Sequence, residues 1–95
     1  MSAIVEKLRQ YLPELEQHYH VKSLGVFGSW ARGEQRKGSD LDVLVEFGEN
    51  GPTLLGFVHL ENYLSELLGI KIDLVEKNTL KPEIGRLILE EVLSI

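Results

Sequence analysis

Hydrophobic residues recur along the chain at helical and strand spacings, which predict helices and strands in alternation. Apolar positions three and four residues apart predict a helix over residues 3–17. Its stripe consists of Val5, Leu8, Leu12 and Leu15. Because proline lacks a backbone donor, we expect Pro13 to kink or divide this helix. A short apolar run over Val21–Phe27 predicts the first strand, and residues 28–39 read as a helical turn followed by a loop.

The clearest strand of the sequence is Asp40–Phe47, where apolar and polar residues alternate. Alternation separates the two faces of a strand, so every second residue points the same way. One predicted face carries Leu41, Val43, Val45 and Phe47. The other carries Asp40, Asp42, Leu44 and Glu46.

The second half of the chain predicts a helix, a strand and a closing helix. Thr53 is a suitable N-cap for a helix reaching Leu68, and Gly69 is well placed to end it. Ile70–Val75 reads as a third strand, and Pro82 fits the first turn of a last helix. The side chains expected to face inward from the two helices are Leu54, Phe57, Leu60, Leu64, Leu67, Ile84, Leu87, Ile88 and Val92.

This order predicts a small α/β (α+β) domain over residues 1–95, with a mixed three-stranded sheet flanked by helices. Its 43% hydrophobic content is that of a chain with a packed core, and no apolar run is long enough to cross a membrane. The ten Lys and Arg residues are scattered among fifteen acids, which argues against a long nucleic acid as partner. Cysteine is absent, as suits a reducing cytoplasm.

The aspartates are placed where strands do not usually carry them. The chain has twelve glutamates but three aspartates, Asp40, Asp42 and Asp73, and each lies in or at the start of a predicted strand. Asp40 and Asp42 leave the same face, and Asp73 joins them if the third strand pairs with the second. Clustered carboxylates repel one another unless they bind cations or protons, and such oxygen clusters suit Mg²⁺. A plain strand end or an exposed edge strand would explain the same residues without a metal.

Gly28 and Ser29 lie where the first strand runs into the helical turn. A glycine lets the backbone approach a ligand closely, and free amides at a helix start attract anions. An isolated Gly-Ser is most often a plain turn. Its fixed distance from Asp40 and Asp42 instead suggests a phosphate site beside a metal site.

The combined pattern resembles a known family. "GS", ten residues and "DLD", with a later aspartate in "IKIDLV", is similar to the signature of the DNA polymerase β-like nucleotidyltransferases. The stretch "FGSWARGEQRKGSDLDVLV" resembles in particular the stand-alone minimal nucleotidyltransferases (MNT). The likeness covers almost the whole chain, including a closing helix after "LKPEI". It implies a nucleotidyltransferase core like the polymerase β palm.

The resemblance also implies roles for individual residues. Asp40 and Asp42 would bind two Mg²⁺ ions, while Asp73 would ligate the second ion or act as base. Gly28 and Ser29 would hold the β- and γ-phosphates of ATP, and Arg32 would serve the site or its loop. The reaction would transfer AMP to a hydroxyl and release pyrophosphate.

The acceptor implied by the resemblance is a tyrosine of a HEPN-type helical toxin, with the transferase acting as antitoxin. Two alternatives stay open: an antitoxin that neutralises its partner by contact alone, and a homodimeric transferase acting on a small molecule. A homo- or hetero-oligomer is expected because so short a chain leaves no space for an acceptor domain. Among the remaining residues, we expect Trp30 to pack, Glu46 to lie outside the site, and Arg36, Lys37, Glu90 and Glu91 to be solvated.

Overall fold

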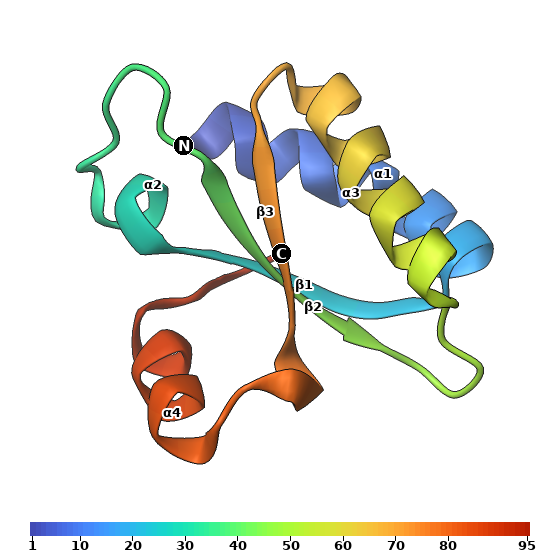
Figure 1. Cartoon of the computed structure of the whole chain (residues 1–95). Coiled ribbons are helices and arrows are strands. Elements are labelled where there is room, and N and C mark those ends of the chain that lie inside the picture. Colours follow the sequence, from blue (N-terminus) through green and yellow to red (C-terminus); the bar gives the residue numbers. More distant parts are fainter.

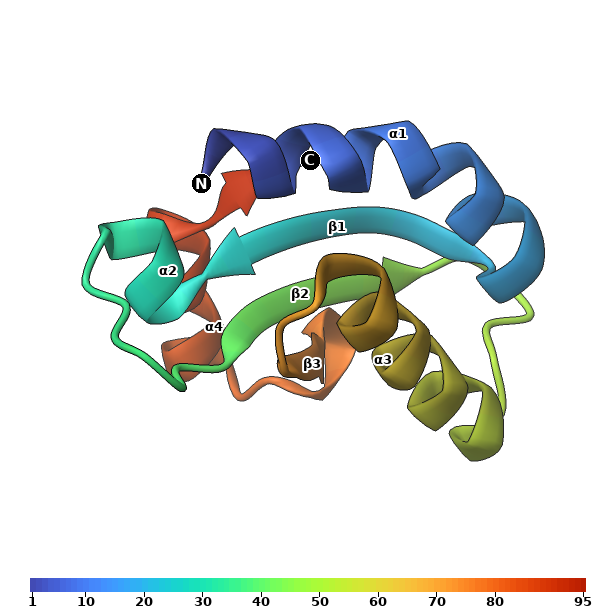
Figure 2. The same ribbon diagram turned by 90° about the horizontal axis from the view of Figure 1, so that it is seen from above.

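Two helices cover one face of a four-stranded sheet in the computed structural model of the chain, which describes residues 1–95 (Figure 1). The helices are α1 (Ser2–Tyr19), α2 (Gly28–Arg32), α3 (Leu54–Leu68), the 3₁₀ helix η1 (Lys77–Thr79) and α4 (Pro82–Glu91). The strands are β1 (Val21–Phe27), β2 (Leu41–Phe47), β3 (Ile72–Glu76) and β4 (Leu93–Ser94). Viewed from above, α1 runs along β1, while α2 and α4 lie together at the left-hand end of the sheet (Figure 2).

The sheet has the strand order β3-β2-β1-β4. β1 is antiparallel to both β2 and β4, whereas β2 and β3 are parallel, so the sheet is mixed as predicted. The prediction of three strands is wrong, because β4 adds a fourth. This strand has two residues, which pair with Gly25 and Val26 of β1. A two-residue strand exists only through its partner, so it leaves no alternation in the sequence.

The core lies between the sheet and helices α1 and α3. Leu8 and Leu15 of α1 and Leu60 and Leu64 of α3 are fully buried. They meet the predicted inner face of β2, of which Leu41, Val43 and Val45 are fully buried. The alternation of β2 is therefore confirmed, and its other face is turned away from α1 and α3. None of the helices combines the length and apolar composition that crossing a bilayer requires.

The predicted ends of α3 are confirmed by their local geometry. The Thr53 hydroxyl accepts a hydrogen bond from the Gly56 amide at 3.2 Å, and Gly69 has the left-handed conformation that ends a helix. The expected division of α1 at Pro13 is not found, since α1 continues through this residue. Buried leucines lie on both sides of Pro13, at positions 8 and 15, so packing holds the helix together despite the missing donor.

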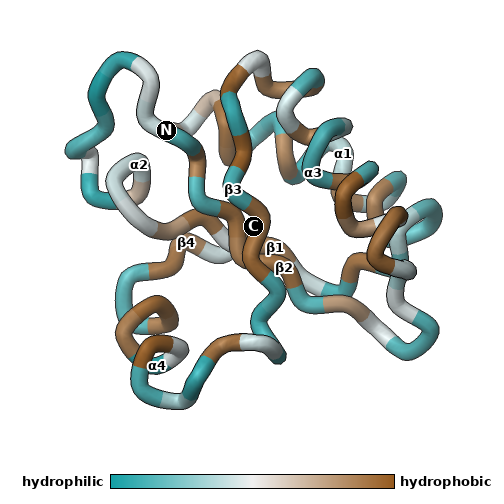
Figure 3. Tube along the Cα trace, viewed as in Figure 1, coloured by the Kyte–Doolittle hydropathy of each residue, from teal (hydrophilic) through white to brown (hydrophobic).

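Several apolar side chains predicted to face inward are exposed. Leu54 in the first turn of α3 is 79% exposed, and Ile84 and Leu87 of α4 are 51% and 64% exposed. These side chains of α4 are exposed because this helix packs beside α2 rather than over the core, and none of its residues is buried. The hydrophobic segments of α4 are visible at the bottom of Figure 3.

A matched pair of leucines on α3 tests this packing. We expect Leu64→Ala to lower the free energy of unfolding by ~2–5 kcal/mol, since it leaves a cavity in the core. The control Leu55→Ala removes the same atoms from a side chain that is 82% exposed, and should change stability by less than about 0.5 kcal/mol. Urea unfolding of both variants measures the difference. Equal losses would contradict the assigned core.

Candidate functional site

Pairing of β2 with β3 sets two aspartates side by side. In their parallel register Asp42 lies opposite Asp73. The neighbours Leu41 and Val43 point into the core, so both carboxylates project from the face that α1 and α3 leave uncovered. Asp42 is half-buried, Asp73 is exposed, and Asp40 is half-buried immediately before β2. The predicted approach of Asp73 to Asp42 is thus found at the start of the parallel strands.

The environment of Asp42 disfavours its charge. Burial raises the pKa of Asp42 above its usual range, and the negative charge of Asp73 raises it further. A hydrogen bond to Asp73 and the charge of Asp40 act in the same direction, while Arg32 lowers the pKa. Asp42 therefore lies where additional positive charge would be most stabilising.

The aspartates have the chemistry of a divalent-cation site but are not preformed as one. None of Asp40, Asp42 and Asp73 forms an ion pair with a lysine or arginine. Nor does any group of three His, Cys, Asp or Glu side chains converge closely enough to hold a metal ion. Carboxylate oxygens without cationic partners are the ligands that Mg²⁺ prefers. The donor set fits such an ion, and adjustment of the side chains would complete its coordination.

The Gly28 turn lies directly against Asp42. Gly28 adopts a positive φ of 76°, a conformation that favours glycine, and a side chain there would overlap the Asp42 carboxylate. Gly28 is buried and Ser29 half-buried at the start of α2. The structure thus brings the predicted Gly-Ser turn and Asp42 into contact, with no room for a side chain between them.

A glutamate side chain at the end of α4 accepts a hydrogen bond from the Gly28 amide. The Gly28 N–H donates to Glu91 Oε1 at 2.9 Å, and Arg32 Nη1 donates to both Glu91 oxygens at 3.2 and 3.1 Å. The Gly28 hydrogen bond and then the Arg32 hydrogen bond lower the pKa of Glu91. The prediction that Glu91 is merely solvated is wrong. No local signal could have revealed this contact, because Gly28 and Glu91 are 63 residues apart.

Arg32 is held at the same position by two acids. Its Nε donates to Glu34 Oε1 at 2.9 Å, in addition to the Glu91 pair. The Arg32 side chain is 46% exposed, so it remains accessible beside Gly28. The structure therefore places Arg32 next to the Gly-Ser turn.

The loop before Asp40 is fastened to α2. Trp30 is half-buried against the core, which confirms that it packs, and its Nε1 donates to the Ser39 carbonyl at 3.3 Å. The Ser39 hydroxyl accepts from the Arg36 amide at 2.9 Å. These contacts fix the residue before Asp40. Arg36 and Lys37 are exposed and form no ion pair.

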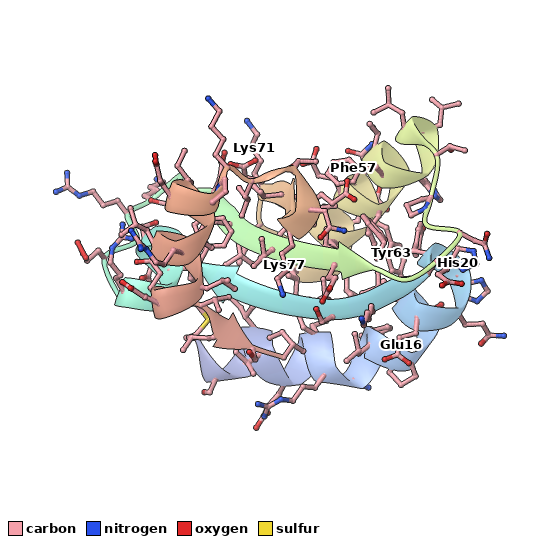
Figure 4. All side chains as sticks on the ribbon, turned by 90° about the horizontal axis from the view of Figure 1, so that it is seen from below. Glu16, His20, Phe57, Tyr63, Lys71 and Lys77 are labelled. Atoms are coloured by element: carbon pink, nitrogen blue, oxygen red, sulfur yellow. The ribbon has the colours of Figure 1, made fainter.

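Glu46 lies outside the group of aspartates, as predicted. Its Oε1 accepts from Ser23 at 3.1 Å and lies 3.8 Å from Lys77 Nζ, and its Oε2 lies 4.0 Å from Lys22 Nζ. Lys77 extends over the strands in Figure 4, whereas Lys71 points away from them. The charge of Glu46 is thus already balanced by lysines, in contrast to that of the aspartates.

The largest cavity of the molecule is remote from these groups. It has a volume of about 660 Å³ and lies where β2 and β3 end, between Phe47, Phe57 and Asn78. Phe47 is five residues beyond Asp42 along β2, or about 16 Å at the usual rise of a strand. None of the predicted site residues lines this cavity. The open face around Asp42 is therefore the better candidate, because it holds the reactive groups.

The Gly28 amide, the Arg32 guanidinium and carboxylates without cationic partners lie at this face. The amide and guanidinium can bind phosphate oxygens, and the carboxylates can bind the cations that accompany a nucleoside triphosphate. The groups at this face are therefore suited to a nucleoside triphosphate and its cations. The chain belongs to the nucleotidyltransferase domain family, whose pattern matches residues 5–95.

Named relatives and solved structures agree with this assignment. The chain is 46% identical, over its full length and 95% of the relative, to the protein adenylyltransferase MntA of Thermococcus cleftensis. A solved structure described as a minimal nucleotidyltransferase superposes with a TM-score of 0.83 and 35% identity, covering 99% of this chain and 94% of that one. The resemblance to minimal nucleotidyltransferases is confirmed.

More distant structures share the fold. A complex of a tri-AMPylated Shewanella oneidensis HEPN toxin with an MNT antitoxin matches with a TM-score of 0.61 and 17% identity, covering 98% of this chain and 66% of that one. A toxin–antitoxin structure with AMP-PNP matches with a TM-score of 0.70 and 21% identity, covering 96% and 68%.

The raised pKa of Asp42 predicts a stability effect that depends on pH. Folding favours its protonated form, so ionisation of Asp42 lowers stability as the pH rises from its ordinary pKa of 3.8 to the raised value. In metal-free buffer, Asp42→Asn should therefore melt at a higher temperature than the unmodified protein at pH 7, with the gap closing below about pH 3.8. Thermal melts followed by circular dichroism measure the gap. Exposed Glu49→Gln serves as control, and a destabilised Asp42→Asn at pH 7 would contradict the electrostatic account.

Proposed function

We propose that the protein transfers AMP from ATP to a hydroxyl of a protein partner. The acceptor is a tyrosine of a HEPN-type toxin, which the transfer inactivates. One observation carries the proposal: unpaired Asp42 and Asp73 stand opposite each other beside the amide of Gly28. This arrangement would allow separate places for the triphosphate, its cations and an incoming hydroxyl.

The triphosphate would bind at the Gly-Ser turn. The Gly28 amide already donates to a carboxylate, which supports its use for phosphate oxygens. The Ser29 hydroxyl provides a further donor, and Arg32 supplies positive charge beside it. These residues would hold the β- and γ-phosphates and leave the α-phosphate over β2.

The aspartates would hold two Mg²⁺ ions. Asp40 and Asp42 come from one strand start and Asp73 from the neighbouring strand. Bound Mg²⁺ would neutralise charge on the attacking and leaving oxygens of an in-line displacement. The mutual repulsion at Asp42 supports this assignment, since a cation would relieve it.

The chemical step is a displacement at the α-phosphate. The acceptor oxygen forms a bond to the α-phosphorus, the bond from this phosphorus to the bridging oxygen of the β-phosphate breaks, and pyrophosphate leaves. The proton of the acceptor hydroxyl passes to the Asp73 carboxylate or to water beside it. Exposure of Asp73 supports this role, because a protein side chain can approach it from solvent.

The protein nature of the acceptor is supported by the named relatives and by charge. The Thermococcus relative is named a protein adenylyltransferase, and the Shewanella complex contains an AMPylated HEPN toxin. A net charge of −5 suits a protein acceptor better than a long nucleic acid. ATP supply and the absence of cysteine support a cytoplasmic setting.

Neutralisation by contact is a second candidate function. The observation that favours it is the exposed apolar surface of α4, where Ile84, Leu87 and Leu89 are 51%, 64% and 49% exposed. Such residues could bind a partner without chemistry. AMP transfer should depend on Asp42, whereas neutralisation by contact should not, so replacement of Asp42 separates the two functions.

Isotope transfer tests the reaction. The purified protein, Mg²⁺ and ATP labelled at the α-phosphate are incubated with a lysate of the organism that encodes the protein. We expect a labelled protein band with the α-label and none with the γ-label. Asp42→Asn should lower labelling by at least about 100-fold, because several kcal/mol of metal-assisted stabilisation are lost.

Glu46→Gln is the matched control, since Glu46 lies on the same face of the same strand and is already paired with lysines. It should retain labelling. Toxin neutralisation that survives Asp42→Asn would support contact alone. Labelled small molecules without a labelled protein would instead indicate a small-molecule acceptor.

Ligand-dependent stability tests the proposed site separately from the acceptor. At about a hundredfold excess over its dissociation constant, Mg-ATP should stabilise the fold by ~2.7 kcal/mol, because it binds only the folded chain. ATP with EDTA should stabilise it less, and Asp42→Asn should remove the magnesium-dependent part. Thermal melts with a common ionic strength measure this. A melting temperature that Mg-ATP leaves unchanged would contradict the proposed activity.

A further inference from the structure

The contact between Glu91 and Gly28 has a consequence for the proposed function. Glu91 Oε1 accepts from the Gly28 amide at 2.9 Å, and this amide is the donor assigned above to the triphosphate. One N–H cannot donate fully to both acceptors. Nucleotide binding and the Glu91 contact therefore exclude each other at this atom.

We propose that Glu91 is an intramolecular competitor that occupies the phosphate-binding position of the nucleotide-free protein and is displaced by the triphosphate. The proposal rests on the proposed function, since it needs a nucleotide bound at Gly28. It assigns to α4 a role in setting the affinity for ATP. Glu91 is then neither a metal ligand nor a catalytic residue.

The chemistry of the contact supports competition. A carboxylate resembles a phosphate in charge and in the spacing of its acceptor oxygens, and Glu91 uses both oxygens on the partners that a phosphate would use. It binds the Gly28 amide and accepts from Arg32 at 3.1 and 3.2 Å. Displacement of Glu91 would release the amide and the guanidinium together.

The surroundings make displacement inexpensive. The Glu91 side chain is 32% exposed, so it can turn into water without being buried elsewhere. α4 has no buried residue that would resist a shift of its last turn. The segment after it is anchored independently, because Val92 packs over Gly25 and β4 pairs with β1. Glu91 can therefore leave the amide while the sheet stays intact.

The charge balance favours exchange for a nucleotide bound with cations. Glu91 binds the Gly28 amide, and Gly28 lies directly against Asp42, whose charge is already disfavoured by Asp73 and Asp40. A triphosphate carries Mg²⁺ with it and compensates the aspartates, whereas Glu91 brings no cation. The competitor should thus yield to Mg-ATP more readily than to a metal-free anion.

A different role for Glu91 would give the opposite result. If Glu91 served only to orient Arg32 toward the phosphates, its removal would weaken nucleotide binding. If it competes with the phosphates, its removal strengthens binding. The sign of the change in affinity therefore separates the two roles.

The first measurement is the dissociation constant of α,β-methylene ATP with Mg²⁺, determined by calorimetry on the full chain. We expect Glu91→Gln to lower it roughly three- to tenfold, because the competing carboxylate becomes a weaker neutral acceptor. Glu91→Ala should also lower this dissociation constant. Glu90→Gln is the control, since it makes the same change of charge on an exposed neighbour and should leave the constant unchanged.

A second measurement follows the Gly28 amide itself by nuclear magnetic resonance. Without nucleotide, its chemical shift should differ between the unmodified protein and Glu91→Gln, because its acceptor differs. With saturating α,β-methylene ATP and Mg²⁺ the two shifts should coincide, since both amides then donate to phosphate. A difference that persists in the bound state would overturn the proposal.

The outcomes separate this inference from the proposed function. Binding that is equal or weaker in Glu91→Gln overturns the competitor role and leaves the nucleotide site in place. The absence of nucleotide binding in every variant overturns both. Tighter binding in Glu91→Gln and Glu91→Ala, with Glu90→Gln unchanged, supports the competitor.

Discussion

The parallel pairing of β2 with β3 is the constraint on which the rest of the molecule depends. Its register places Asp42 opposite Asp73, so two like charges are held on neighbouring strands without a cation between them. The same pairing sends Leu41 and Ile72 to the opposite face, where they are buried under α1 and α3. A shift of the strand register by one residue would turn the aspartates toward the core and Leu41 toward solvent. The hydrophobic face therefore fixes the geometry of the charged one.

This division explains how the chain tolerates an unfavourable site. Burial of the apolar residues on one face stabilises the sheet, and the repulsion at Asp42 on the other face reduces that stability. Gly28 reaches its positive φ of 76° without strain because it is a glycine, and this lets the backbone approach Asp42 closely. The repulsion is thus concentrated at one end of the sheet. Carboxyl groups with a perturbed pKa are typical of functional sites.

Much of the fold and part of the site could be predicted from local patterns. The alternation in β2, the Thr53 cap and the Gly69 stop depend on neighbouring residues, so they are readable in the sequence. The association of Gly28, Asp40 and Asp42 was suggested by their spacing, and the parallel pairing sets Asp73 opposite Asp42. The missed features depend on distant partners: β4 exists only by pairing with β1, and Glu91 acts on an amide 63 residues earlier. The exposed leucines of α4 were misjudged because helical periodicity marks an apolar stripe without saying what covers it.

The order of synthesis determines when the two edges of β1 become paired. β1 lies between β2 and β4, and both strands follow it in the sequence. Val26 of β1 pairs with Leu93 of β4, and at about 5–20 residues per second the 67 residues from one to the other take roughly 3–13 seconds to synthesise. During that interval the edge of β1 that β4 later covers has unpaired backbone donors and acceptors. An open edge can accept a strand from another chain, so the nascent protein passes through a stage in which neighbouring copies on one messenger can pair wrongly.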